Sequence, residues 1–351
     1  MTRIVAVENI DEALRRTYGT RMRISRDKAL LGERKGKWRI IDPAERPSTR
    51  SAAEVKVATG AKEAKRVRKA RISWVQDNEV DWRGGAEFSA RHVVEVGERC
   101  GFHVEPMTPS SFRADAMANA ELVVLNNLWH FSGEQMRAIL AVLFEMRVPY
   151  VKYEHDHREL TRPEFSRRLF ERAVMNVFLS PVHRENHRDG IGAAGECIPL
   201  AIDVDAYRPI PGIQRIPGTA LVCNVRTIKT WDRLKEYVFG HPEITFTVLA
   251  TNGIIQGKNV RTIPPVLPEK MPELYSAHEF LVHLPDAWCA GERVVLEAAL
   301  CGCKVIANER VGHTSWGWDM TDIDALRDRL ADAPYEFWRL VGGLIAKRAA
   351  A

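Results

Sequence analysis

The sequence predicts an α/β protein with two Rossmann-like domains facing a cleft and a basic N-terminal extension. From about residue 70 onward, short β-rich apolar runs alternate with segments of helical periodicity, which is typical of parallel sheets built from βαβ units. The segment RPIPGIQRIPG (208–218) has three prolines and divides this alternation into two sets. Residues 1–70 carry 19 Lys and Arg against 9 Asp and Glu, whereas the remainder has a net charge of −5.

Each domain is predicted from its own series of apolar runs. In the first domain we expect strands at 71–76, 102–106, 121–126, 149–154, 175–180 and 196–200, with helices between them such as 85–99 and 133–146. In the second domain we expect strands at 219–225, 244–250, 280–285 and 303–307, with helices near 230–239, 270–277 and 292–301.

The pattern divides the chain into four parts. We expect a basic extension (1–70), an N-terminal Rossmann-like domain (71–207), a C-terminal Rossmann-like domain (208–330) and a C-terminal helix (331–351). The last part, DIDALRDRLADAPYEFWRLVGGLIAKR, reads as two helices, and a terminal helix of this kind could cross back over the cleft.

Composition places the chain among globular proteins. The apolar fraction is 45%, and no apolar run approaches the ~20 residues that span a bilayer. The start of the chain has no apolar signal region. The six cysteines are scattered without a Cys-x-x-Cys pair, so we expect free thiols in a reducing, cytoplasmic compartment.

The basic extension is densest at KEAKRVRKAR (62–71). Blocks of this kind often contact phosphate backbones, which makes Lys65, Arg66, Arg68 and Lys69 candidate nucleic-acid-binding residues. The alternative is a solvated arm or linker.

Two short stretches have the residue types of a nucleotide site. Gly84 and Gly85 lie where a strand gives way to a helix, so backbone amides there can approach a phosphate; the alternative is a simple turn. In PDAWCAGERVVLEAALCGCKVIAN (285–308), Glu292 and Glu297 stand beside an apolar run. Glu297 is either solvated or binds the hydroxyls of a nucleotide sugar, and this stretch alone leaves both open.

Four segments in order resemble the GT-B glycosyltransferases, specifically their large retaining family 4. They are WRGGAEFSARHVVEVGERCGFHV (82–104), CIPLAIDVDAYRP (197–209), RTIPPVLPEKMPELYSAHEFLVHLP (261–285) and the stretch 285–308. The resemblance covers roughly residues 71–330 and implies a GT-B fold with an acceptor domain followed by a donor-binding domain.

The resemblance also implies a donor site. Glu297 matches the second glutamate of the family's Glu-x7-Glu region, which binds the ribose hydroxyls, and backbone amides around Arg293 and Val294 would face the phosphates. Cys289 stands where the family has its first glutamate, and Glu292 is the nearby acid that would substitute for it.

Three further residues are candidates for catalysis by the same resemblance. Arg226 and Lys229 correspond to the family's basic pair, which neutralises the leaving diphosphate, although two residues separate them where the family more often has four. His155, at the end of a strand, matches a histidine that faces the sugar; the alternative is a capping role for the Asp156–His155 pair.

Two further patterns contain residue types that bind metals, but neither is expected to form a metal site. His155, Asp156 and His157 would share a face only if the strand stayed extended, and the Asp203-Val-Asp205 pattern lies inside the linker motif. We expect no metal site and no tightly bound cofactor.

The implied activity is retaining transfer of a sugar from a nucleotide-diphosphate sugar, most simply a UDP-sugar, to a hydroxyl acceptor. With the basic extension, the best candidate acceptor is a hydroxymethylated base in DNA, which bacteriophage enzymes of this fold glucosylate; the protein would then work in the host cytoplasm. Protein or surface-glycan acceptors, a non-catalytic GT-B binding protein and a nucleotide-sugar epimerase remain alternatives.

Overall fold

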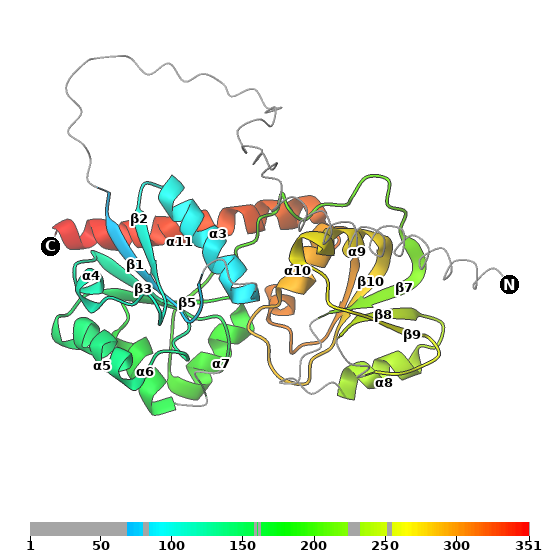
Figure 1. The fold of residues 1–351 in the computed structure, drawn as a ribbon, viewed down its shortest axis with the longest axis horizontal. Helices are drawn as coiled ribbons and strands as arrows, with labels where there is room; N and C mark the ends of the chain where they lie inside the picture. The colour runs from blue at the N-terminus through cyan, green and yellow to red at the C-terminus, as the bar shows by residue number, and fades with distance from the viewer. Residues whose placement is uncertain are drawn as a thin grey trace, which may run out of the picture. The chain divides into compact units, whose positions relative to one another are not determined.

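The computed structural model describes residues 69–79, 84–157, 160, 163–223, 232–250 and 255–350. Within them the chain forms two parallel sheets with helices packed around them, as expected (Figure 1). No helix of these residues is long and apolar enough to cross a membrane. All six cysteines are free thiols, as predicted.

The first sheet has six strands in the order β2-β1-β3-β4-β5-β6. These strands are β1 (Arg71–Val75), β2 (His103–Met107), β3 (Leu122–Leu125), β4 (Tyr150–Tyr153), β5 (Met175–Phe178) and β6 (Glu196–Cys197). The helices are α3 (Gly85–Arg99), α4 (Ala114–Ala118), α5 (Gly133–Leu140) with the π-helical turn η3 (Ala141–Glu145), α6 (Pro163–Arg172) and α7 (Pro181–Ile191).

The second sheet has five strands in the order β11-β10-β7-β8-β9. They are β7 (Ile216–Val222), β8 (Thr245–Leu249), β9 (Val260–Ile263), β10 (His278–His283) and β11 (Lys304–Ala307). The helical segments are α8 (Asp232–Gly240), η5 (Pro268–Lys270), α9 (Met271–Ala277), α10 (Arg293–Leu300), η6 (Gly312–Trp316) and α11 (Ile323–Ala350).

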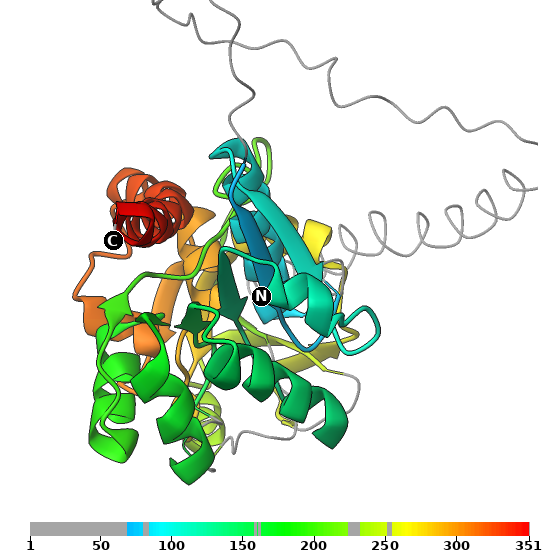
Figure 2. The same ribbon diagram turned by 90° about the vertical axis from the view of Figure 1, so that its left-hand side faces the viewer.

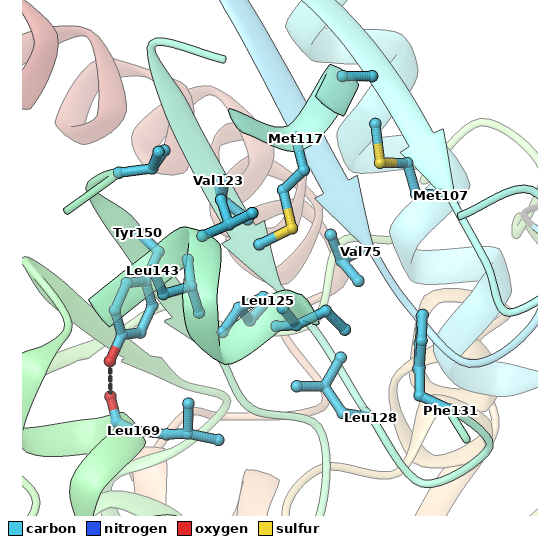
Figure 3. Packing of buried hydrophobic residues seen from close by; sticks show 14 residues of the cluster. Val75, Met107, Met117, Val123, Leu125, Leu128, Phe131, Leu143, Tyr150 and Leu169 are labelled. Atoms are coloured by element: carbon cyan, nitrogen blue, oxygen red, sulfur yellow. Dashed lines mark hydrogen bonds between the residues drawn. The ribbon is translucent and has the colours of Figure 1, made fainter. Parts of the chain in front are cut away.

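One face of the first sheet packs against α4, α5, η3 and α6. Figure 3 shows Val75, Val123 and Leu125 of the strands against Met117 and Leu143 of the helices. The hydroxyl of Tyr150 donates to the carbonyl of Leu169 over 2.6 Å, so the polar end of this buried ring is satisfied. Burial on both faces explains why these strands read as continuous apolar runs.

The opposite face of the first sheet is covered by α3 and α11, and Figures 1 and 2 show α11 on the side away from α5 and α6. Phe337 of α11 packs edge-on against Trp74 of β1 and Tyr153 of β4. The indole Nε1 of Trp338 donates to the Val93 carbonyl of α3 over 2.7 Å. The end of the chain therefore completes the core of the first sheet.

The prediction of two C-terminal helices is wrong, because α11 is one helix of 28 residues that contains Pro334. A proline inside a helix costs about 3 kcal/mol, since it removes one hydrogen bond and crowds the preceding turn. The buried residues continue at helical spacing through that point, from Leu330 to Phe337 and Val341. Packing of this apolar stripe outweighs the cost of the proline.

Candidate functional site

A cavity of about 470 Å³ lies where the strands of both sheets end. Its lining includes Gly84 after β1, His155 after β4, Cys223 after β7 and the start of α10 after β10. Ligands of open parallel sheets bind at the carboxyl ends of the strands, so this is the position where a site is expected. Seven residues predicted from the sequence line it: Gly84, Gly85, His155, Glu292, Arg293, Val294 and Glu297.

The glycine pair is where α3 begins and where the chain passes close to α10. Gly84 is the extended residue before the helix, and Gly85 is its first residue. A Cβ built on Gly85 would lie 3.4 Å from Cδ of Arg293, in ordinary contact. The absence of side chains here leaves the first amides of α3 open toward the cavity.

Glu297 and Arg293 form a buried ion pair one helical turn apart. Nε of Arg293 donates to Oε1 of Glu297 over 2.9 Å, and the two side chains are 11% and 7% exposed. The hydroxyl of Tyr275 donates to Oε2 of Glu297 over 3.2 Å. Burial and the adjacent Glu297 carboxylate raise the pKa of Tyr275 well above its usual value, so its hydroxyl stays a donor.

The Arg293 guanidinium also connects the second sheet's helix to the first half of the chain. Its Nη1 donates to Oγ of Ser89 in α3 over 2.9 Å and to the Ala201 carbonyl over 3.1 Å. Its charge also lies over the ring of Phe88. Arg293 is therefore held on several sides, and it fixes Glu297 at the cavity wall.

The first turn of α10 forms the cavity wall next to this pair. Glu292 is the extended N-cap residue, and its side chain makes no capping hydrogen bond to the helix. The carboxylate lies 3.9 Å from Nε2 of His283. The Val295 amide donates to the Glu292 carbonyl over 3.1 Å. The amides of Arg293 and Val294 precede this first bond of the helix and can bind an anionic group beside Glu292.

His155 follows β4 and is 7% exposed. Burial, together with the charges of Lys152 and Arg293, lowers the pKa of His155 to about 3, so the ring is neutral at pH 7. Its Nε2 has no hydrogen-bond partner among the described residues. A buried ring nitrogen of this kind at a cavity is suited to a polar group of a ligand.

A buried charge pair supports the backbone at His155. Nζ of Lys152 lies 2.6 Å from Oε2 of Glu154, and neither side chain is exposed. Oε1 of Glu154 accepts from the amides of His155 and Asp156 over 3.2 Å each. The carboxylate therefore stabilises the turn that directs His155 toward the cavity.

The remaining predicted residues are mostly outside the part of the chain that the structure describes. Arg226 and Lys229, and also Lys65, Arg66 and Arg68, lie outside the described residues. Lys69 is described; its Nζ lies 3.5 Å from Oε2 of Glu98, and it does not line the cavity.

Sequence reasoning missed four residues of this site. Tyr207 and Tyr275 line the cavity, and the Tyr207 hydroxyl interacts with both Arg293 and Glu297. Lys152 in β4 and Glu154 directly after it form the buried pair that supports His155. The alternation of charge in YVKYEHD (150–156), inside a strand otherwise expected to be apolar, is the one signal that could have indicated the Lys152–Glu154 pair.

Neither a family model nor a curated protein sequence matches the chain. Solved structures do match. Sucrose-phosphate synthase of Thermosynechococcus elongatus has a TM-score of 0.59 at 14% identity, over 81% of this chain and 100% of the other. Anabaena Alr3699/HepE in complex with UDP-glucose has a TM-score of 0.55 at 13% identity, over 80% and 99%.

A third match is an alpha-glucosyltransferase in complex with UDP and a 13-mer DNA containing a HMU base. Its TM-score is 0.52 at 12% identity, over 77% of this chain and 95% of the other. The chain has the GT-B fold. In GT-B terms, the cavity lies between the carboxyl ends of the two sheets, and α11 returns from the second sheet to pack on the first.

Proposed function

We propose that the protein is a retaining glycosyltransferase that moves a sugar from a nucleotide-diphosphate sugar to a hydroxyl acceptor. The observation that carries the proposal is the gathering of seven residues, predicted from two halves of the sequence, around one cavity of a GT-B fold. A volume of about 470 Å³ is in the range of pockets that take small molecules. UDP is the nucleotide we favour, because Alr3699/HepE is solved with UDP-glucose and the alpha-glucosyltransferase with UDP.

The donor would lie against α10. The Glu297 carboxylate already accepts from Arg293 and Tyr275, but a carboxylate has about four lone-pair sites and retains capacity for ribose hydroxyls. The first amides of α10 would bind the diphosphate, and Glu292 would take sugar hydroxyls in place of the acid that Cys289 replaces.

No protein nucleophile is needed in this reaction. The acceptor hydroxyl attacks the anomeric carbon on the face from which the diphosphate leaves, and an oxygen of the leaving diphosphate takes the hydroxyl proton. Negative charge grows on the diphosphate as the bond breaks, and Arg226 and Lys229 are proposed to stabilise it. His155, neutral and buried, would hold a sugar hydroxyl through Nε2.

We further propose that the acceptor is a hydroxymethylated base in DNA. Two observations support this: the excess of positive charge in residues 1–70, and the likeness to an alpha-glucosyltransferase solved with a DNA that contains a HMU base. The base would have to leave the stack to reach the cavity, which costs a few kcal/mol of unstacking.

The test is transfer of labelled sugar by the purified chain. UDP-glucose and other nucleotide sugars are offered with hydroxymethylated DNA, plain DNA, a protein mixture and a glycan mixture. We expect label in hydroxymethylated DNA alone, with the anomeric configuration retained in the product. Label in protein or glycan would reject the DNA acceptor while keeping the transferase.

The second candidate is a GT-B protein that binds a nucleotide sugar without turnover. The replacement of the first motif glutamate by the buried Cys289 favours it. It predicts saturable UDP binding with neither transfer nor slow hydrolysis of any nucleotide sugar. Detectable hydrolysis that is lost in Glu297→Gln would reject it.

A further inference from the structure

The loop between β10 and α10 carries three buried groups of the types that bind transition metals. His283 is the last residue of β10, Cys289 lies in the loop, and Glu292 is the N-cap residue of α10. One ligand atom from each lies within 4.8 Å of the other two. We propose that these three residues bind a zinc ion that holds this loop in the wall of the cavity.

The donor set favours zinc over magnesium and calcium. Imidazole, thiolate and carboxylate are the ligands of zinc, whereas magnesium and calcium select oxygen ligands and are not held by a thiolate. Tetrahedral zinc with bonds of about 2.0–2.3 Å places its ligand atoms roughly 3.3–3.8 Å apart. The three side chains would supply three of its four ligands, and a water molecule would supply the fourth. The 3.9 Å between Nε2 of His283 and Oε2 of Glu292 is already close to that spacing.

The charges of the proposed site sum to zero. A Zn²⁺ ion is balanced by one thiolate and one carboxylate, and the imidazole binds as its neutral form, so the Cys289 thiol gives up its proton on binding. All three side chains belong to buried residues. A neutral cluster avoids the large cost of leaving a net charge in a buried place.

The backbone around Cys289 is fixed independently of any ion. Its amide donates to the Arg310 carbonyl over 2.8 Å, and its carbonyl accepts from the Gly312 amide over 2.8 Å. The thiol is therefore held at a set position between His283 and Glu292, which bracket the loop. Zinc there would tie the end of β10 to the first turn of α10, and Glu292 lines the cavity.

A separate cluster of three histidines differs from the proposed zinc site. His157, His183 and His187 also lie within 4.8 Å of one another by one nitrogen each. However, Nδ1 of His183 accepts from the Leu179 amide over 3.2 Å, and its Nε2 bonds to the Asp156 carbonyl over 3.1 Å. Because both ring nitrogens of His183 are engaged with backbone, this cluster is a packing feature.

The zinc ion would fix the shape of the loop between β10 and α10, and it would take no part in stabilising the leaving diphosphate. Arg226, Lys229 and helix amides remain the groups proposed to neutralise the leaving group. From the sequence we expected no metal site, and a zinc ion here would depart from that expectation. Zinc at His283, Cys289 and Glu292 would serve a structural role and does not depend on the proposed activity. It would take one carboxylate oxygen of Glu292, and the other oxygen would remain for the sugar hydroxyl assigned to this residue.

The experiment measures metal content and ligand type in the full chain. Protein purified from zinc-supplemented cells is dialysed and its zinc is measured by mass spectrometry; we expect one zinc per chain. After exchange for Co²⁺, we expect a thiolate-to-cobalt charge-transfer band and the visible bands of a tetrahedral ion. Cys289→Ser and His283→Gln should each lower zinc to less than a tenth and remove the charge-transfer band.

Cys303→Ser is the matched control. Both cysteines are 3% exposed, and each thiol donates to a backbone carbonyl, of Ala287 for Cys289 and of His278 for Cys303. The control should keep one zinc per chain. Zinc retained by both Cys289→Ser and His283→Gln, or lost equally in the control, would overturn the site.

Should the Cys289 and His283 variants fail to fold, the metal-stripped wild-type chain decides. It is titrated with Co²⁺ while circular dichroism confirms that it stays folded. A charge-transfer band that saturates at one equivalent supports the site, and its absence overturns it. Neither readout uses a nucleotide sugar, so the result is independent of whether the chain is a transferase.

Discussion

At the scale of single residues, Glu297 combines a structural and a binding role. Its carboxylate is paired with Arg293 and Tyr275 and also lines the cavity. Removal of the side chain would leave Arg293 buried without its carboxylate, which typically costs 3–5 kcal/mol. Glutamine keeps the volume and one acceptor oxygen, and it exchanges the other oxygen for an NH2 donor, so it removes the negative charge with the least change of shape.

We expect Glu297→Gln to weaken UDP binding by about 1.5–3 kcal/mol, the value of a hydrogen bond to a charged group. Titration calorimetry with UDP measures this, and a thermal melt checks that the variant is folded. The control is Glu309→Gln, a change at a side chain that is 64% exposed and pairs with Arg233 away from the cavity. Unchanged UDP affinity in folded Glu297→Gln would contradict the ribose assignment.

His155 supplies a second prediction at this scale. The proposal places it against the sugar, so His155→Gln should lower turnover ten-fold or more and leave the affinity for UDP, which lacks the sugar, unchanged. Because the pKa of His155 is about 3, its ring is neutral throughout the range from pH 5 to 8. The wild-type rate should therefore show no inflexion near pH 6.5 that His155→Gln removes; finding one would contradict the neutral role.

At the scale of elements, the contact of α3 with α11 depends on one glycine. A Cβ on Gly97 would lie 2.4 Å from Cζ2 of the Trp338 indole, well below contact distance. By contrast, Gly343 of α11 has nothing within 4 Å of its Cβ position. Both glycines are in helices, so they differ mainly in what surrounds them.

We expect Gly97→Ala to destabilise the protein by about 1–3 kcal/mol, because overpacking forces α11 away from α3. Gly343→Ala should be neutral or stabilising by up to about 1 kcal/mol, since alanine favours helix more than glycine does. Urea unfolding of both variants measures the difference. Equal stabilities would show that α11 is not packed on α3 in solution.

The elements show where sequence reasoning works. Strands buried on both faces were predicted within a few residues, as for 71–76 against β1 (Arg71–Val75), because an apolar run is what such a strand requires. β9 (Val260–Ile263) was missed, since this edge strand of four residues has no fully buried position and so no apolar run. α11 was split in two because a proline is a local signal, whereas packing on α3 is not visible locally.

The residues of the candidate site were likewise predicted only where the signal is local in the sequence. Gly85 was predicted from the change of a strand into a helix, and Glu292 and Glu297 from the resemblance of residues 285–308 to a family motif, because both signals are local in the sequence. The contacts of Arg293 with Ser89 and Ala201 could not, since these residues are distant along the chain. Tyr207 and Tyr275 were missed for the same reason: both are distant from Glu297 along the chain, and their hydroxyls meet its carboxylate only in the folded structure.

At the scale of the whole molecule, several histidines are buried in the neutral form. Burial lowers the pKa of His278 to about 4, and its Nδ1 and Nε2 bond to the Leu274 carbonyl and the Thr247 hydroxyl. Burial also lowers the pKa of His155, to about 3. In the unfolded chain these rings have a pKa near 6.5, so the unfolded state binds more protons as the pH falls below that value.

Stability should therefore be fully present above about pH 6.5 and decline toward pH 4, by up to about 1.4 kcal/mol per pH unit for each such histidine. Urea unfolding at pH 7.5, 6 and 5 measures the slope. His278→Gln should reduce the slope, whereas His103→Gln, at an exposed position on β2, serves as the control. A slope that His278→Gln leaves unchanged would contradict the buried neutral form.

The last prediction concerns the separation of charge along the chain. Residues 1–70 carry a net charge of +10, and the rest carries −5. If the extension serves a DNA acceptor, the protein should bind duplex DNA with an affinity that falls steeply with salt, because each phosphate neutralised releases about one counterion. The donor cavity, by contrast, is lined wholly by residues from Gly84 onward.

Deletion of residues 1–70 should therefore abolish the salt-dependent DNA affinity and leave UDP affinity unchanged. A milder variant replaces Lys65, Arg66 and Arg68 with glutamine and should reduce the slope of log affinity against log salt by about three. Mobility-shift titrations at two salt concentrations, with plain and hydroxymethylated duplexes, measure both. An extension that only solvates the chain or contacts a protein predicts no shift even at low salt, and that result would redirect the search for the acceptor to proteins.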